Sequence, residues 1–343
     1  MRLKIVTYYY SNNYGALLQS LYMKEFLEKN FEHEVSFSKY IPKKLFFREH
    51  YKPLLKKNLK LFLQNLNKFW KIKKWKKNIA GLEKPLSKYD DFDNDISLYG
   101  SDEIWNFTNP FFGFDPFFFG ENNNTKKISY ATSIGNADIN KLTTENRKKI
   151  KYLLNTFASI SVRDLGTANF IEDLIGKKPE IVVDPTLLLN SEKINSSNIK
   201  IKTSNFAIVY GNYFLDDEKK MILQYCEKNH LNLVSIGYYN GWIKKNYINL
   251  NPDEFINYFK DANNVFTSMF HGVMFSVKYN KQFWYSSDPY RKNKLEYFIN
   301  NLNLNSQSIK SSNNFKEMID YKITNIKLKK WIELSKKYIF SII

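Results

Sequence analysis

A histidine and a glycine stand between two apolar segments in the run SMFHG at 268–272. The residues before it, 265–267, are typical of a buried strand, and the apolar spacing from 273 to 279 is typical of a helix. Ligands of open α/β sheets bind at such strand ends, and the amides of a helix start attract anions. An imidazole exchanges protons near neutral pH, so His271 is a candidate acid or base beside a bound anion. The alternative is a hydrogen-bonded helix cap.

Two further polar runs follow segments that are typical of strands. The run GSDEIWN at 100–106 combines a flexible glycine with a carboxylate, Asp102, that can accept a proton, and with Trp105, whose ring face suits a sugar. The run NNYG at 12–15 follows the strand expected at 3–7. Each run is also compatible with an ordinary turn or a capped helix.

An arginine, Arg163, stands at the end of another strand-like segment, 159–162. Its guanidinium can hold a carboxylate or a phosphate through two parallel hydrogen bonds. The run YATSIG at 130–135 follows a strand in the same way. Because parallel strands present their carboxyl ends at one edge of a sheet, we expect these groups beside a cleft between two domains. A surface ion pair is the alternative for Arg163.

Strand-like and helix-like segments alternate along the chain, which predicts parallel sheets flanked by helices. The polar stretch 190–205 is the best linker candidate. We therefore expect an α/β fold with one Rossmann-like domain at 1–192 and a second at 193–325, their parallel sheets facing a central cleft. A terminal helix within 326–343 is expected to pack back on the N-terminal domain.

The composition indicates a globular protein with anionic partners. The 343 residues suit about two domains, and 52 basic against 34 acidic side chains give a net charge of +18. Cys226 is the single cysteine, which excludes an internal disulfide and a multi-cysteine metal site. We find neither a signal peptide at the amino end nor an apolar run of about 20 residues. These features predict a cytoplasmic protein.

Much of the positive charge lies in the segment 43–78. Thirteen lysines and arginines stand there against one acid, Glu49, for a net +12. Apolar residues recur at helical spacing, which predicts a basic amphipathic helix inserted in the N-terminal domain. Such a helix can bind an anionic surface and would make the protein peripheral on the inner face of the plasma membrane. A packed helix with a solvated lysine face is the alternative, and nucleic acid is not an expected partner.

Taken in order, these motifs resemble those of the polysaccharide pyruvyl transferase family over residues 1 to about 305. The resemblance rests on Asn13-Tyr14-Gly15-Ala16 with Gln19, Tyr89-Asp90, Gly100-Ser101-Asp102 with Trp105-Asn106, Tyr130-Ala131 with Ser133 and Gly135, Ser161-Val162-Arg163, Asp184-Pro185-Thr186, and Ser268 with Phe270-His271-Gly272. It implies a GT-B-like fold. It also implies transfer of pyruvate from phosphoenolpyruvate to two hydroxyls of a sugar in a capsule, an exopolysaccharide or a lipid-linked precursor. The implied reaction uses phosphoenolpyruvate as co-substrate, with no metal and no cofactor.

The resemblance also suggests roles for individual residues. His271 would be the acid or acid/base, and Asp102 would orient or deprotonate the acceptor. The donor side would comprise Arg163, Ser268, Phe270, Gly272, Arg291 and Lys294. The acceptor side would comprise Asn12, Asn13, Tyr14, Ser101 and Trp105. Met269 stands where some members of the family carry an arginine, and Arg291 is the candidate replacement.

Two other functions stay open at this point. A glycosyltransferase that uses a nucleotide sugar would share the GT-B-like architecture, although the second domain offers no good candidate for a ribose-binding acid. An inactive scaffold, bound to membranes near enzymes of polysaccharide assembly, is compatible with Met269 and with the basic segment 43–78.

Overall fold

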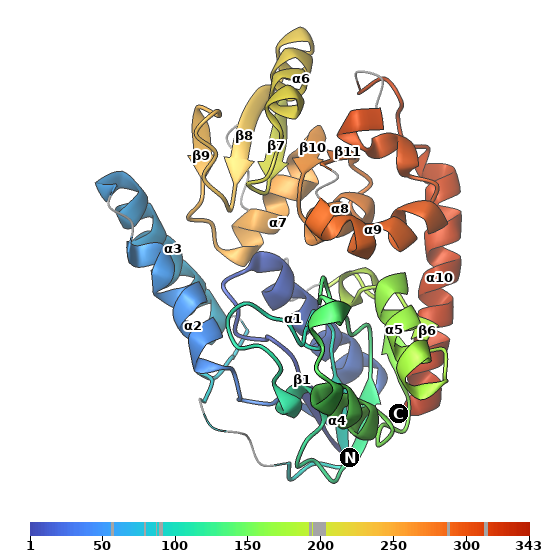
Figure 1. The fold of residues 1–343 in the computed structure, drawn as a ribbon. Coiled ribbons are helices and arrows are strands. Elements are labelled where there is room, and N and C mark those ends of the chain that lie inside the picture. Colours follow the sequence, from blue (N-terminus) through green and yellow to red (C-terminus); the bar gives the residue numbers. More distant parts are fainter. Residues whose placement is uncertain are drawn as a thin grey trace. The chain divides into compact units, whose positions relative to one another are not determined.

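The computed structural model describes residues 1–343 apart from 56–57, 79, 87, 89–91, 192–193, 195–203, 287–288 and 312–314, and for 289–294 it describes the backbone alone. The chain forms two compact units, and Figure 1 follows it from end to end. Unit 1 consists of Met1–Tyr51, Leu82–Asn190 and Lys329–Ile343. Unit 2 consists of Lys52–Gly81 and Ser191–Leu328.

Unit 1 contains a four-stranded parallel sheet in the order β2-β1-β3-β4. Its strands are β1 (Arg2–Val6), β2 (Glu34–Phe37), β3 (Ile96–Tyr99) and β4 (Lys126–Ser129). A second parallel pair joins β5 (Ser161–Val162) to β6 (Glu180–Ile181). All four side chains of β3 are buried, because a central parallel strand is covered on both faces.

Several helices of unit 1 are capped at their amino ends by a side chain that accepts a hydrogen bond from a backbone amide of the first turn. Asn13, Thr143 and Asp164 do so for α1, α4 and α5. The α-helices are α1 (Tyr14–Asn30), α2 (Lys43–His50), α4 (Thr144–Leu154) and α5 (Leu165–Ile175), and the 3-10 turns are η2 (Pro116–Phe119), η3 (Ile139–Lys141) and η4 (Pro185–Leu187). The caps at Asn13 and Asp164 let a helix start a few residues after a strand has ended.

Unit 2 contains a five-stranded parallel sheet in the order β11-β10-β7-β8-β9. Its strands are β7 (Phe206–Tyr210), β8 (Asn232–Ile236), β9 (Lys245–Tyr247), β10 (Asn264–Thr267) and β11 (Gln282–Tyr285). Its helical elements are η1 (Lys52–Leu55), α3 (Leu59–Asn78), α6 (Asp216–Lys228), α7 (Pro252–Asp261), α8 (Phe270–Lys278), α9 (Pro289–Asn301), η6 (Asn305–Gln307) and η7 (Ile309–Ser311). The expected α/β class with parallel sheets is therefore confirmed.

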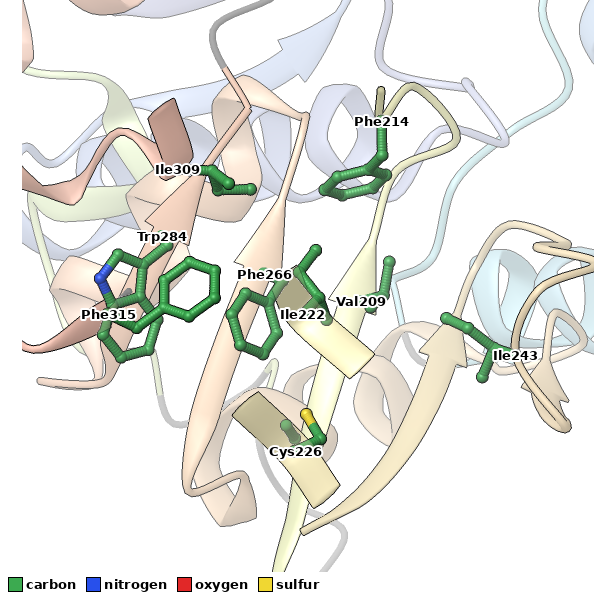
Figure 2. Close-up of a cluster of buried hydrophobic side chains, with 10 residues drawn as sticks. Val209, Phe214, Ile222, Cys226, Ile243, Phe266, Trp284, Ile309 and Phe315 are labelled. Carbon is green, nitrogen blue, oxygen red and sulfur yellow. The ribbon is translucent and has the colours of Figure 1, made fainter. Parts of the chain in front are cut away.

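An aromatic core fills the space beside the sheet of unit 2 (Figure 2). The rings of Phe266, Trp284 and Phe315 lie together with centroid separations of 5.0–5.6 Å. Cys226 lies in the same cluster, and burial raises the pKa of its thiol to about 12. The single cysteine is therefore a core residue and not a nucleophile.

The segment 43–78, which we expected to be one insert of the N-terminal domain, is divided. Helix α2 belongs to unit 1, whereas α3 belongs to unit 2. The terminal helix α10 (Tyr321–Ile342) starts in unit 2, and from Lys329 onward its residues belong to unit 1. Trp331 Nε1 there donates a hydrogen bond to the Ile181 carbonyl at 3.0 Å. Within the described ranges, no helix has both the length and the apolar character needed to cross a membrane.

Candidate functional site

The turn after β3 places Asp102 at the carboxyl edge of the sheet of unit 1. Gly100 has a φ of +116°, and a Cβ at this position would lie 2.3 Å from the Tyr130 carbonyl oxygen. Only glycine therefore allows the chain to turn this close to the end of β4. The Ser101 carbonyl accepts a hydrogen bond from Thr7 Oγ1 at 2.8 Å, and Ser101 Oγ pairs with Gln19.

Ser101 is fully buried by these contacts, so its expected role in binding an acceptor is wrong. Its hydroxyl instead joins the turn after β3 to α1, and its carbonyl joins the turn to Thr7, directly after β1. Gln19 Nε2 continues this network to Thr7 Oγ1 at 3.3 Å. Three segments that are distant in sequence thus hold the backbone from which Asp102 projects.

Arg163 is held between two carboxylates. Its Nη2 lies 3.3 Å from Asp102 Oδ1, and its Nη1 lies 3.4 Å from Asp184 Oδ2. The Arg163 side chain is only 2% exposed. Burial alone would lower the pKa of Arg163, but the charges of Asp102 and Asp184 raise it above its ordinary value. The guanidinium therefore stays charged and holds Asp102, and it is not presented to a donor as we expected.

The three members of this ion cluster differ in exposure. Asp184 is fully buried, and its Oδ1 also accepts hydrogen bonds from Thr186 N and Oγ1 at 3.0 and 2.8 Å. The Asp102 side chain is 13% exposed, and its Oδ1 also accepts from Glu103 N at 2.8 Å. Asp102 is therefore the member of the cluster that can meet a substrate.

A tyrosine that the sequence analysis did not select lies beside Asp102. Tyr8 Oη donates a hydrogen bond to the Glu103 carbonyl at 3.4 Å. Burial, followed by the charges of Asp102 and Glu103, raises the pKa of Tyr8 well above its ordinary value, so the phenol stays neutral. A usable signal was present, because Tyr8 comes directly after the strand expected at 3–7.

The expected acceptor residues at the start of α1 have structural partners. Asn13 Oδ1 caps the helix by accepting from Gly15 N at 2.9 Å. Asn12 donates its backbone amide to Glu49 Oε2 and its side-chain amide to the Glu49 carbonyl, both at 3.2 Å. Both asparagines are half-buried, so a surface remains for a ligand. Tyr14 is buried, and its ring does not offer the face that we expected.

Trp105 is a core residue, and its expected role in stacking on a sugar ring is wrong. Its side chain has no exposed area, and its Nε1 donates to the Phe118 carbonyl at 2.8 Å. The indole stacks on Phe119 and meets the edge of Phe157, with centroid separations of 5.9 and 5.8 Å. The indole is therefore enclosed within unit 1, where it packs against Phe119 and Phe157.

In unit 2, His271 lies in the first turn of α8, directly after β10. The Met269 amide, which precedes the helix, donates to Thr267 Oγ1 at 3.0 Å. The imidazole is 9% exposed and lies beside the rings of Phe270 and Phe275, with centroid separations of 5.2 and 6.4 Å. The helix is short but regular, so its amino end carries partial positive charge. His271 thus combines a small exposed area with an apolar surrounding.

The neighbouring predicted donor residues shape the backbone around His271. Ser268 is buried, its amide donates to the Tyr210 carbonyl at 3.2 Å, and its Oγ accepts from Tyr213 N at 3.3 Å. The Gly272 amide donates to the Met269 carbonyl at 3.0 Å. The amides of Ser268 and Gly272, which we expected to help bind the donor, are therefore engaged within the chain.

Two glycines allow this part of unit 2 to pack closely. A Cβ on Gly211, whose φ is +130°, would lie 2.1 Å from Ser268 Oγ. A Cβ on Gly272 would lie 2.0 Å from Thr267 Oγ1, which is itself bonded to the Tyr210 carbonyl at 2.7 Å. The loop after β7, the end of β10 and the start of α8 thus pack so closely that a Cβ atom does not fit at either glycine.

We expect the variant Gly272→Ala to lower the stability of unit 2 by about 1–3 kcal/mol, because the added methyl group has no space beside Thr267. Chemical denaturation followed by tryptophan fluorescence measures this loss. Gly166→Ala is the matched control, since Gly166 also lies in the first turn of a helix and its Cβ would meet only Asp164 Oδ1, at 3.5 Å. Equal stability of the two variants would contradict the close packing.

Arg291 and Lys294 lie in α9, and their side chains fall outside the described residues, as do Tyr89 and Asp90 entirely. Shortly before α9 in the sequence, Ser286 Oγ donates a hydrogen bond to Glu218 Oε2 at 2.8 Å. Glu218 Oε2 also accepts a hydrogen bond from Leu215 N at 2.9 Å. The sequence analysis did not select Glu218. Among the described side chains, no group of three or more histidines, cysteines and acids is placed to hold a metal ion.

The family model described as polysaccharide pyruvyl transferase matches residues 13–287, a span that contains both the Asp102 turn and His271. No curated protein matches the chain.

Solved structures show likeness over the whole length. The UDP-GlcNAc 2-epimerase from Neisseria meningitidis bound to UDP-GlcNAc shares 10% identity, with 100% of this chain and 99% of that chain covered and a TM-score of 0.52. The S. aureus MnaA-UDP co-structure shares 13% identity with a TM-score of 0.49, covering 100% and 97%. A Streptomyces glycosyltransferase complexed with thymidine diphosphate shares 8% identity with a TM-score of 0.47, covering 98% and 99%. At such identities the likeness concerns the fold alone, and the GT-B-like class is confirmed.

Proposed function

Because the chain belongs to the polysaccharide pyruvyl transferase family, we propose that it moves pyruvate from phosphoenolpyruvate to two hydroxyls of one sugar, in a surface polysaccharide or its lipid-linked precursor. The central carbon of the donor forms two C–O bonds to the sugar, while its C–O bond to phosphate breaks. The methylene carbon gains a proton and becomes a methyl group. The two hydroxyls lose two protons, of which one balances this gain and the other leaves with the phosphate.

The observation that supports this proposal most is the ion cluster of unit 1. Asp102, Arg163 and Asp184 come from three of the motifs by which the sequence resembles the family, and Arg163 lies 3.3 Å from Asp102 and 3.4 Å from Asp184. We propose that Arg163 orients Asp102, and that Asp102 accepts a hydrogen bond or a proton from a sugar hydroxyl. Arg163 is then a positioning residue.

His271 is proposed as the acid that protonates the donor's methylene carbon. Its place in the first turn of α8 supports this role, because the partial positive charge of a helix start favours a phosphate group nearby. Its low exposure supports the role as well, since proton transfer to carbon needs protection from water. No metal ion and no cofactor take part in the proposed reaction.

The proposal is tested with the wild-type protein, phosphoenolpyruvate carrying ¹³C in its methylene group, and a panel of saccharides with and without a lipid carrier. We expect phosphate release that depends on the acceptor, together with a new ¹³C methyl signal of a ketal. Sugar transfer from a nucleotide sugar without phosphoenolpyruvate would overturn the proposal in favour of a glycosyltransferase. Absence of both reactions across the panel would favour a scaffold and would equally overturn it.

A further inference from the structure

One face of helix α3 is anchored to the rest of unit 2 by hydrogen bonds. Lys71 Nζ lies 3.1 Å from both carboxylate oxygens of Glu254, and Trp75 Nε1 donates to Asp253 Oδ2 at 2.9 Å. Lys68 Nζ donates to the Gly237 carbonyl at 3.1 Å. With about 3.6 residues per turn, positions 68, 71 and 75 share one side of the helix. These contacts with the rest of unit 2 therefore fix the orientation of α3 about its axis.

The opposite side of α3 carries a row of apolar side chains. Leu59, Leu63, Leu66 and Trp70 follow one another at intervals of four, three and four residues, which places them in one stripe. Leu59, Leu63 and Trp70 are 69%, 53% and 56% exposed. A single exposed leucine is ordinary, whereas a continuous row over three turns marks an interaction surface. We call these four residues the outer stripe.

Positive charge surrounds the outer stripe. Helix α3 contains seven lysines and no acidic residue, and Lys60, Lys73, Lys74 and Lys77 are exposed. The Lys73 ammonium lies 5.0 Å from the centroid of the Trp70 ring. Lysine and tryptophan side chains of this kind occupy the level of lipid headgroups, with leucines below them.

We propose that the outer stripe and its lysines bind an anionic lipid surface, with α3 lying in the plane of the membrane interface. Charge complementarity selects this occupant. A second copy of the chain would bring two lysine-rich faces together, and a nucleic acid would leave the leucines in contact with phosphates. The inference does not depend on the proposed chemistry, because neither substrate nor turnover enters its test.

The test is co-sedimentation of the full chain with vesicles of phosphatidylcholine alone or mixed with phosphatidylglycerol. We expect binding to the mixed vesicles only, and loss of that binding as salt is raised to about 0.5 M, where charges are screened within a few ångströms. The variant Leu63→Asn/Trp70→Gln should weaken binding about tenfold or more by removing apolar anchors. Lys73→Gln/Lys77→Gln should weaken it mainly at low salt.

Matched controls remove similar groups elsewhere. Lys177→Gln/Lys178→Gln removes two exposed charges from unit 1, and Tyr152→Gln/Leu223→Asn removes two exposed apolar side chains from α4 and α6. Both controls should bind vesicles like the wild type, and circular dichroism should show that every variant is folded. Equal binding by all variants, or no binding to the mixed vesicles, would overturn the proposal. Dimers that form without lipid and disappear in Leu63→Asn/Trp70→Gln would overturn it in favour of a second copy.

Discussion

If the proposed role of His271 holds, replacing it with alanine should lower the rate of pyruvyl transfer by about 10²–10⁴-fold, which is the usual contribution of a side chain that transfers a proton in the transition state. The loss corresponds to about 3–5 kcal/mol of activation free energy. It should appear in kcat, because the proton reaches carbon after the donor has bound. Single-turnover measurement of phosphate release separates this step from substrate binding.

The matched control for this variant is His230→Asn. His230 is exposed, lies in the same unit and has a φ of +52°, a conformation that asparagine tolerates. We expect this control to keep the wild-type rate. An active His271→Ala protein would show that the proton comes from another group, and an inactive His230→Asn protein would show that the assay reports folding instead of chemistry.

The sequence predicted the interior strands of the sheets better than their edge strands. The segments 3–7 and 265–267 match β1 and β10 to within one residue at each end, because central parallel strands are short, continuous apolar runs. The expectation did not include β2 and β9. Both are edge strands that carry charged or polar residues, such as Glu34 and Lys245, and hydrogen bonding to a neighbouring strand defines them more than their own pattern does.

The sequence located the turns of the candidate site but not the burial of their side chains. Trp105 and Asp102 stand in one short run after the same strand, yet the indole enters the aromatic core and the carboxylate reaches the surface. Composition cannot separate these outcomes, because a tryptophan suits both a core and a sugar-binding face. The contacts that decide, with Phe118, Phe119 and Phe157, come from segments that follow the turn by many residues.

The same limit explains the reassignment of Arg163. An arginine after a strand can bind an anionic ligand or an acid of the same chain, and local sequence does not distinguish the two. The structure brings Asp102 and Asp184 to its guanidinium from positions 61 and 21 residues away. The guanidinium is thereby held between two carboxylates of its own chain, which local sequence does not reveal.

Replacing Arg163 with methionine should destabilise unit 1 by about 3–5 kcal/mol, the cost of leaving buried charge without its counter-ion. Methionine has a similar volume, so little of the effect comes from a cavity. Because two units need not unfold together, the measurement is hydrogen exchange of the amides of β3 and β5 under native conditions, where local opening is resolved. Protection in the sheet of unit 2 should change little, since the partners of Arg163 belong to unit 1.

The control is Arg147→Met, which breaks an ion pair of Arg147 with Asp173 at 2.6 Å, in which the two side chains are 40% and 68% exposed. An exposed pair of this kind contributes less than about 1 kcal/mol. The double variant Arg163→Met/Asp184→Asn should regain part of the lost protection, because one unpaired charge has been removed with the cation. If Arg163→Met instead kept full protection and only raised the KM for phosphoenolpyruvate, the guanidinium would be a donor ligand, and the positioning role assigned to it would be wrong.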